Sequence, residues 1–282
     1  KSLYLNDNFT MPITNIFKAF PFLEKLSLPM YYDMNGFPLS ASEHLTYLQL
    51  GSGYSENCDF LINYPNLVTI DFQNFTIRKM VSIHSFPKIK KVIFPLDYIK
   101  DIDIHLVFPN IEVLHILSKF DRDISSLNLC TNLKKLKLGS KFDREINITV
   151  PLEVLKFGYT FNRPLLINTK KLRKLHFGAL FNKPLVQDFP ELQYIGFGRE
   201  FNQNVDIIFK SGKLVEAIFG SSFNKPLQIT TKQNIRVLSF SDKYNQDINH
   251  FAEFLPLLYD LRFGDKFDQN IDAYKGFNIK YL

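Results

Sequence analysis

The side chains best suited to chemistry in this chain are basic residues that recur about once in every 20 residues. Lysine ammonium groups and histidine imidazoles in such a row would attract an anion or an acidic protein surface. Valine and tyrosine residues at the same positions would supply apolar anchors for a partner. The predicted partner-binding residues are Lys91, Val113, His115, Lys135, Lys137, Val154, Lys156, Lys174, His176 and Tyr194. A second basic row, flanked in sequence only by Asn and Pro, comprises Arg163, Lys183 and Lys225.

These residues alternate with leucine and other apolar residues in short segments of period two, such as Leu136-Lys-Leu138. Alternation of this kind predicts a strand, and alternate side chains of a strand share a face. If Leu136 and Leu138 point inward, Lys135 and Lys137 point outward. A further apolar residue three positions earlier completes L-x-x-L-x-[LF], the strand pattern of leucine-rich repeats. One strand per repeat predicts a single parallel sheet whose outward face is basic at its centre.

An aromatic phrase follows each strand and sets the phase of the repeat. It occurs eight times, at Phe120, Phe142, Phe161, Phe181, Phe201, Phe223, Tyr244 and Phe267, each followed by Asn or Asp. With less clarity it extends back through Tyr98, Phe75, Tyr54, Tyr32 and Phe9. We expect the aromatics to form core ladders and the Asn or Asp side chains to close turns or to bond to the adjacent turn. Glycines after the strands, such as Gly178 and Gly198, indicate a positive φ or close approach of neighbouring backbones.

The predicted fold is a β-rich solenoid of about 13 turns of 19–23 residues, with one parallel sheet and few or no regular α-helices. It occupies residues 1–282 as a single array, with the clearest repeats at 120–271. Short extended segments are expected on the return path of each turn. Examples are Ile146-Asn-Ile148, Pro164-Leu-Leu-Ile167, Val205-Asp-Ile207 and Leu227-Gln-Ile229. Neither end shows a polar capping repeat, so we expect a longer natural protein or a partner that covers the ends.

The phrase and its strand resemble the FNIP repeats, a leucine-rich-repeat-like class of social amoebae and of giant viruses of amoebae. No turn spells Phe-Asn-Ile-Pro, and proline is kept only at Pro164, Pro184 and Pro226. Some members of that family carry an F-box, which implies a substrate adaptor of a ubiquitin ligase. Nothing in this sequence matches an F-box, so a Skp1-type partner would need residues outside this chain.

Composition favours a protein of the cytoplasm, or of the host cytoplasm if the chain is viral. The chain has a net charge of +6, no apolar run long enough for a membrane span and no signal-peptide pattern. The two cysteines lie several turns apart, which argues against a disulfide. No catalytic motif, phosphate loop or cofactor motif occurs. Calcium binding by a row of carboxylates is disfavoured, because five of the eight residues after the phrase aromatics are amides.

Three functions remain open from the residues alone. The first is a non-enzymatic protein-interaction scaffold that binds an acidic protein on the strand face. The second is binding of an anion, such as nucleic acid, by the same lysines. The third is a structural part of a larger assembly. The lysines also have a plainer interpretation, since they would keep an exposed sheet soluble.

Overall fold

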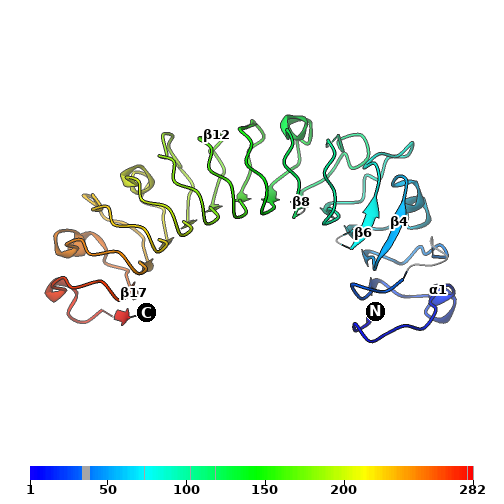
Figure 1. Ribbon diagram of the computed structural model, residues 1–282, viewed down its shortest axis with the longest axis horizontal. Coiled ribbons are helices and arrows are strands. Elements are labelled where there is room, and N and C mark those ends of the chain that lie inside the picture. The colour runs from blue at the N-terminus through cyan, green and yellow to red at the C-terminus, as the bar shows by residue number, and fades with distance from the viewer. Residues whose placement is uncertain (34–38, 73, 102, 118, 278, 282) are drawn as a thin grey trace. The chain divides into compact units, whose positions relative to one another are not determined.

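The computed structural model describes residues 1–33, 39–72, 74–101, 103–117, 119–277 and 279–281. The chain divides into two compact units, an N-terminal unit Lys1–Gly139 and a C-terminal unit Ser140–Leu282. Each unit is a stack of turns, and each turn contributes a short strand to a parallel sheet along one edge of the stack (Figure 1). The prediction of a leucine-rich-repeat-like β-solenoid is confirmed.

The sheet of the N-terminal unit is parallel, and most neighbouring strands come from successive turns. Its strands, in spatial order, are β1 (Ser2–Tyr4), β2 (Lys25–Ser27), β3 (Tyr47–Gln49), β5 (Thr69–Asp71), β7 (Lys91–Ile93), β8 (Val113–Ile116) and β9 (Lys135–Leu138). A separate parallel pair is formed by β4 (Gly53–Ser55) and β6 (Phe75–Ile77).

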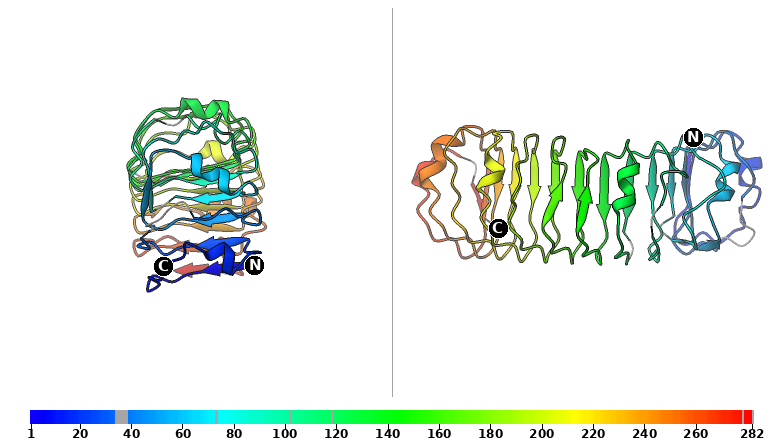
Figure 2. Two further views of the ribbon diagram at one scale, coloured as in Figure 1. Left: turned by 90° about the vertical axis from the view of Figure 1, so that its right-hand side faces the viewer. Right: turned by 90° about the horizontal axis from the view of Figure 1, so that it is seen from above.

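The C-terminal unit repeats this arrangement, and the view from above shows its strands running side by side (Figure 2). Its strands are β11 (Val154–Lys156), β13 (Lys174–His176), β14 (Tyr194–Gly196), β15 (Glu216–Ile218), β16 (Val237–Ser239), β17 (Asp260–Phe263) and β18 (Ile279–Tyr281). A second, two-stranded sheet on the return path pairs β10 (Ile146–Ile148) with β12 (Leu165–Ile167).

Helix is scarce in the described part of the chain, as turns of this length predict. The α-helix there is α1 (Ile16–Ala19), which makes a single turn. Short 3₁₀ helices lie on the return path of several turns: η1 (Asp59–Asn63), η2 (Ser125–Leu129), η3 (Asp206–Phe209), η4 (Asn249–Phe254) and η5 (Asp272–Tyr274).

Two aromatic ladders fill the core of the C-terminal unit. The strand ladder comprises Phe157, Phe177, Phe197, Phe219, Phe240 and Phe263, and the phrase ladder runs from Phe142 to Phe267. Within one turn the two rings stack closely, with centroids 3.7 Å apart for Phe177 and Phe181. Phe181 lies 5.9 Å from the next phrase ring, that of Phe201. All of these rings are almost fully buried except that of Phe267, which is half-buried, so the assignment of the other rings to the core is confirmed.

The Asn and Asp residues that follow the phrase aromatics form a third ladder, of hydrogen bonds, from Asp143 to Asp268. The side-chain oxygen of one member accepts a hydrogen bond from the backbone N–H of its counterpart one turn later. The N–H of Asn182 donates to Asn162 Oδ1 at 2.9 Å, and the N–H of Asn202 donates to Asn182 Oδ1 at 3.0 Å. Asp143 Oδ1 likewise accepts a hydrogen bond from the Asn162 N–H, at 2.8 Å. The ladder therefore joins adjacent turns, as the amide-rich phrase predicts.

Close packing of successive turns explains the glycines that follow the strands. A Cβ on Gly178 would lie 1.7 Å from the carbonyl oxygen of Gly158, and one on Gly198 would lie 2.0 Å from that of Gly178. Neither glycine has a positive φ. Of the two predicted reasons for glycine, the close approach of neighbouring backbones is the one that applies.

Two expectations for local structure are wrong. Tyr54 was expected to be a core aromatic, but its side chain is 54% exposed. In the pair of β4 with β6, Gly53 lies opposite Phe75 and Tyr54 lies opposite Thr76, so the tyrosine is one residue out of phase. On the return path, 205–207 was expected to be extended. Residues from Asp206 onward form η3 instead, because Asn204 Oδ1 accepts the Asp206 N–H at 2.9 Å and starts a tight turn.

The segment 227–229 pairs with no other strand in the described part of the chain, and Leu227 and Ile229 are buried as a return segment requires. The two other expected return segments are strands and pair with one another as β10 and β12.

Candidate functional site

The outward positions of the strands form the candidate site, and the structure assigns them in register within each unit. In the N-terminal unit Lys91, Val113 and Lys135 occupy one rung across β7, β8 and β9. The next rung has Ile93, His115 and Lys137. The residues of both rungs are at least partly exposed, except for Ile93, which is 9% exposed. The sheet therefore brings the five predicted residues of this unit together on three neighbouring strands.

Glu112, one position before β8, forms ion pairs with the lysines at the same position before β7 and β9. Glu112 Oε1 lies 2.9 Å from Lys90 Nζ, and its Oε2 lies 2.9 Å from Lys134 Nζ. Hydrogen bonds from these two lysines hold the pKa of Glu112 at about 2, well below its usual value. This triad was missed by sequence reasoning. Its signal in the sequence is that Lys90, Glu112 and Lys134 alternate in charge and that each directly precedes one of three successive strands.

His115 lies among positive charges. Burial is the main cause that lowers its pKa, to about 4, and the ammonium groups of Lys91 and Lys137 lower it further. The imidazole is therefore uncharged near pH 7. An uncharged imidazole carries one N–H donor and one acceptor, so it can bind an anion by a hydrogen bond without adding positive charge.

In the C-terminal unit the predicted residues again share two rungs. Val154, Lys174 and Tyr194 form one rung across β11, β13 and β14, and Lys156, His176 and Gly196 form the other. Lys156 and Lys174 are exposed, and the other predicted residues are half-buried. The structure thus places half of the predicted set in each unit.

A glycine at an outward strand position shapes this second surface. A Cβ on Gly196 would lie 2.7 Å from His176 Nδ1 and 2.9 Å from the Tyr194 hydroxyl oxygen. The tips of both side chains therefore lean over the glycine. Burial, and then the charge of Glu216, raise the pKa of Tyr194. The lone glycine among larger outward residues is the sequence signal for this arrangement.

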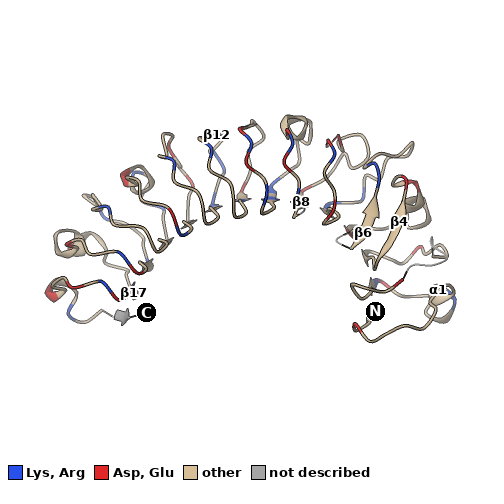
Figure 3. Cartoon of the chain, in the orientation of Figure 1, with Lys and Arg blue, Asp and Glu red and all other residues tan. Residues whose placement is uncertain are grey.

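Further along the same sheet the outward charges are mixed. Asp260 is 4% exposed, and Arg262 holds its two carboxylate oxygens at 3.0 and 2.6 Å. This bidentate pair raises the pKa of the arginine. Positively and negatively charged residues are interspersed along the chain in both units (Figure 3). The basic character is therefore local, and in the C-terminal unit it is limited to β11 and β13.

The second basic row is only partly open to a ligand. Arg163 has neutral neighbours in sequence, but its Nη2 lies 3.1 Å from Asp143 Oδ2 of the preceding turn. Its Nε also donates to the carbonyl oxygen of Asp143 at 3.1 Å. Lys183 is half-buried and Lys225 is exposed. This row contributes one ion pair to the coupling between turns.

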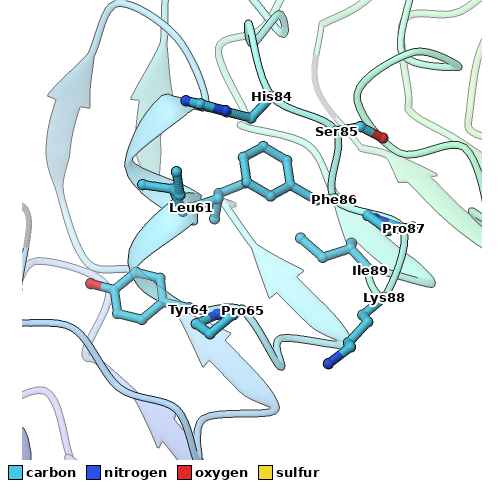
Figure 4. Close-up of a pocket in the computed structure, with 10 residues that line it drawn as sticks. Leu61, Tyr64, Pro65, His84, Ser85, Phe86, Pro87, Lys88 and Ile89 are labelled. Carbon is cyan, nitrogen blue, oxygen red and sulfur yellow. The ribbon is translucent and has the colours of Figure 1, made fainter.

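An apolar groove lies on the return path of the N-terminal unit (Figure 4). It has a volume of about 280 Å³ and is lined by 61–62, 64–65 and 84–89. Ile62, at its edge, is 55% exposed. None of the strand-face residues lines this groove, so it is a separate surface.

Neither cysteine has an activated thiol. Cys58 and Cys130 are free and buried, and burial raises the pKa of both thiols, that of Cys130 to about 11. Protonated, buried thiols are poor nucleophiles. Within the described residues no group of His, Cys, Asp or Glu side chains could hold a metal ion. No described helix has the length and hydropathy to cross a membrane.

Comparison with solved structures agrees with the fold. The chain is similar to CroV588, described as a novel circular LRR protein, with a TM-score of 0.67 and 20% identity over 92% of this chain. It spans 46% of the length of that protein. It is also similar to an internalin, inlF, from Listeria monocytogenes, with a TM-score of 0.57 and 14% identity, covering 99% of this chain and 85% of that one. No protein-family model matches the sequence, and no curated protein matches it. The chain has the fold of a leucine-rich-repeat-like solenoid.

Proposed function

We propose that this chain is a non-enzymatic scaffold that binds an acidic protein through the outward face of its strands. The observation that carries the proposal is the pair of rungs on β7, β8 and β9, where Lys91, Lys135 and Lys137 are at least partly exposed. No acidic residue occurs within these three strands, and the one nearest to them in sequence, Glu112, is engaged by Lys90 and Lys134. The fold is typical of protein-interaction scaffolds.

Lysines on neighbouring strands support this interpretation physically. Strands lie about 4.8 Å apart, so ammonium groups on one face repel one another unless an anion offsets them. Half-buried Val113 in the N-terminal unit, with Val154 and Tyr194 in the C-terminal unit, would supply the apolar contacts that fix a partner. An acidic protein provides both kinds of contact.

Kinship with the FNIP repeats is part of the proposal. The eight aromatic phrases, with a strand and a glycine or small residue ahead of them, support it. A role as the substrate-recognition part of a ubiquitin-ligase adaptor would follow if an F-box were joined to this array. Location in the cytoplasm, or in that of a host, fits the same proposal.

Binding of nucleic acid by the same lysines is the second candidate, favoured by the net charge of +6. Both candidates are electrostatic and would weaken in salt, so salt dependence does not separate them. Direct comparison of duplex nucleic acid with proteins captured from a host lysate does.

The decisive variant reverses four charges on the strand face: Lys135→Glu, Lys137→Glu, Lys156→Glu and Lys174→Glu. A matched control reverses four exposed lysines away from the strands: Lys119, Lys171, Lys232 and Lys266. We expect the first variant to lose its ligand and the second to keep it, with both folded by circular dichroism. Retained binding by the strand-face variant would refute the site. If the wild type captures no protein and the strand-face variant loses duplex binding, the second candidate is favoured.

A further inference from the structure

The two rungs of the N-terminal unit bring basic and apolar residues together around His115. The imidazole lies between Ile93 on β7 and Lys137 on β9, one strand spacing to either side. Lys91 and Lys135 flank Val113 on the adjacent rung. Ile93 is nearly buried and Val113 is half-buried, so the floor of the site is apolar.

The charges around His115 come from three strands. Lys91 lies on β7, whereas Lys135 and Lys137 lie on β9. The carboxylate nearest in sequence, Glu112, is bound to Lys90 and Lys134 in the row before the strands. Further out, the outward residues of β5 are Thr69 and Asp71, and Asp71 is only 5% exposed. The ammonium groups of Lys91 and Lys137 therefore act on one uncharged imidazole, and Lys135 lies on the adjacent rung.

We propose that Lys91, His115, Lys135 and Lys137 form a carboxylate-binding site for an extended acidic peptide segment with acidic residues at alternate positions. The proposal rests on the proposed function and specifies its ligand. In an extended segment, side chains on one face repeat every two residues, about 6.6 Å apart. Lys135 and Lys137 are two residues apart on β9, so their spacing matches such a segment lying along the strand. The methylene groups of the acidic side chains would pack on Val113 and Ile93.

The small extent of the site favours a peptide over duplex nucleic acid. The basic rungs of this unit cover β7 to β9, which is about 10 Å across at the usual strand spacing. Proteins that bind duplexes through phosphates commonly make about 6–10 such contacts. Three lysines and an imidazole are enough for two or three carboxylates.

Occupancy of the site has a spectroscopic consequence. The lysines and burial disfavour protonation of His115 in the empty site. A bound carboxylate offsets the lysine charges and accepts a hydrogen bond from the imidazole, so protonation becomes easier. Binding should therefore raise the pKa of His115 by about one unit, which equals a tenfold change in its protonation equilibrium. A carboxylate bound elsewhere on the sheet would leave it unchanged.

The experiment uses the full chain and a fluorescent peptide of alternating aspartate and serine. A peptide of equal charge, with its aspartates in one block, is the comparison. Fluorescence anisotropy measures affinity, and the Hε1 resonance of His115 is titrated by NMR with and without peptide. His84, on the return path, serves as an internal reference that should not respond. Lys137→Gln should weaken binding about tenfold. Lys25→Gln, an exposed lysine on β2 of the same sheet, is the matched control.

We expect tighter binding of the alternating peptide, an upward shift of the His115 pKa and a loss specific to Lys137→Gln. Binding with His115 unmoved, or with Lys137→Gln equal to wild type, overturns the site and leaves the scaffold function standing. No peptide binding at all also overturns the site. The proposed function is then judged separately, by protein capture with the four-lysine variant. Duplex DNA and unlabelled polyaspartate are also compared as competitors of the bound peptide. If duplex DNA displaces the peptide at a lower concentration than polyaspartate does, the peptide assignment is overturned in favour of nucleic acid.

Discussion

Truncation of Phe181 to alanine is the sharpest test of the aromatic core. The ring of Phe181 is fully buried and stacks on three others: Phe177 at 3.7 Å, and Phe161 and Phe201 each at 5.9 Å. Loss of a buried phenylalanine costs about 3–5 kcal/mol through lost burial and the cavity left behind. Each aromatic pair adds about 0.5–1.5 kcal/mol, although these contributions overlap. We therefore expect a loss near the upper end, about 4–5 kcal/mol.

Urea denaturation followed by circular dichroism measures this loss. For a chain of this size the slope is about 3 kcal/mol per M, so the midpoint should fall by about 1.5 M. Because each turn contacts only its neighbours, the transition should also broaden as the turns on either side of the lesion uncouple. Phe181→Leu keeps apolar volume without the ring and should lose about 1–2 kcal/mol. Tyr159→Ala removes a ring of the same unit that is 49% exposed, and it should change stability by less than about 1 kcal/mol.

An unchanged midpoint for Phe181→Ala would refute the assignment of the phrase aromatics to the core. Equal losses for Phe181→Ala and Phe181→Leu would show that ring stacking, rather than burial, carries the stability. Both results are readable because the exposed control reports how much any loss of a ring costs.

Four further predictions follow from single contacts. Asn182→Ala leaves a backbone N–H of the next turn without its acceptor and should cost about 1–3 kcal/mol, whereas Asn182→Asp should be nearly neutral, because a carboxylate serves at the first position of the ladder. Gly198→Ala should destabilise far more than Gly196→Ala in thermal melts, because the first meets a backbone carbonyl and the second meets only movable side-chain tips. Tyr244→Phe should raise the melting temperature slightly, since the buried hydroxyl has no hydrogen-bond partner among the described residues; a lower value would contradict this. The pKa of His115 is about 4 in the folded protein and near 6.5 in the unfolded chain, so the free energy of unfolding should decline as pH falls from about 6.5 to 4. His115→Gln should lessen that decline. An unchanged pH profile of stability in this variant would contradict the assignment of the decline to His115.

The fold was accessible from sequence because its determinants are local and repeated. Period-two alternation fixes which side chains of a strand face outward, and the structure has the predicted pairs at the predicted rungs, as for Lys135 with Val113 and Lys137 with His115. The aromatic phrase fixes the phase wherever it is clear. Where it fades, at Tyr54, the phase slips by one residue, because a tyrosine that is free to face solvent satisfies the pattern equally well.

The sequence by itself determined the repeat, the strand register, the core ladders and the set of outward residues. Only the tertiary structure decided which charges remain available, because ion pairs form between turns about 20 residues apart in sequence. Glu112 engages Lys90 and Lys134, and Asp143 engages Arg163, although sequence neighbours suggested otherwise for the arginine. The reason is that the stacking of turns brings side chains from successive turns within about 5 Å, so their partners lie in the next turn and not beside them in the chain.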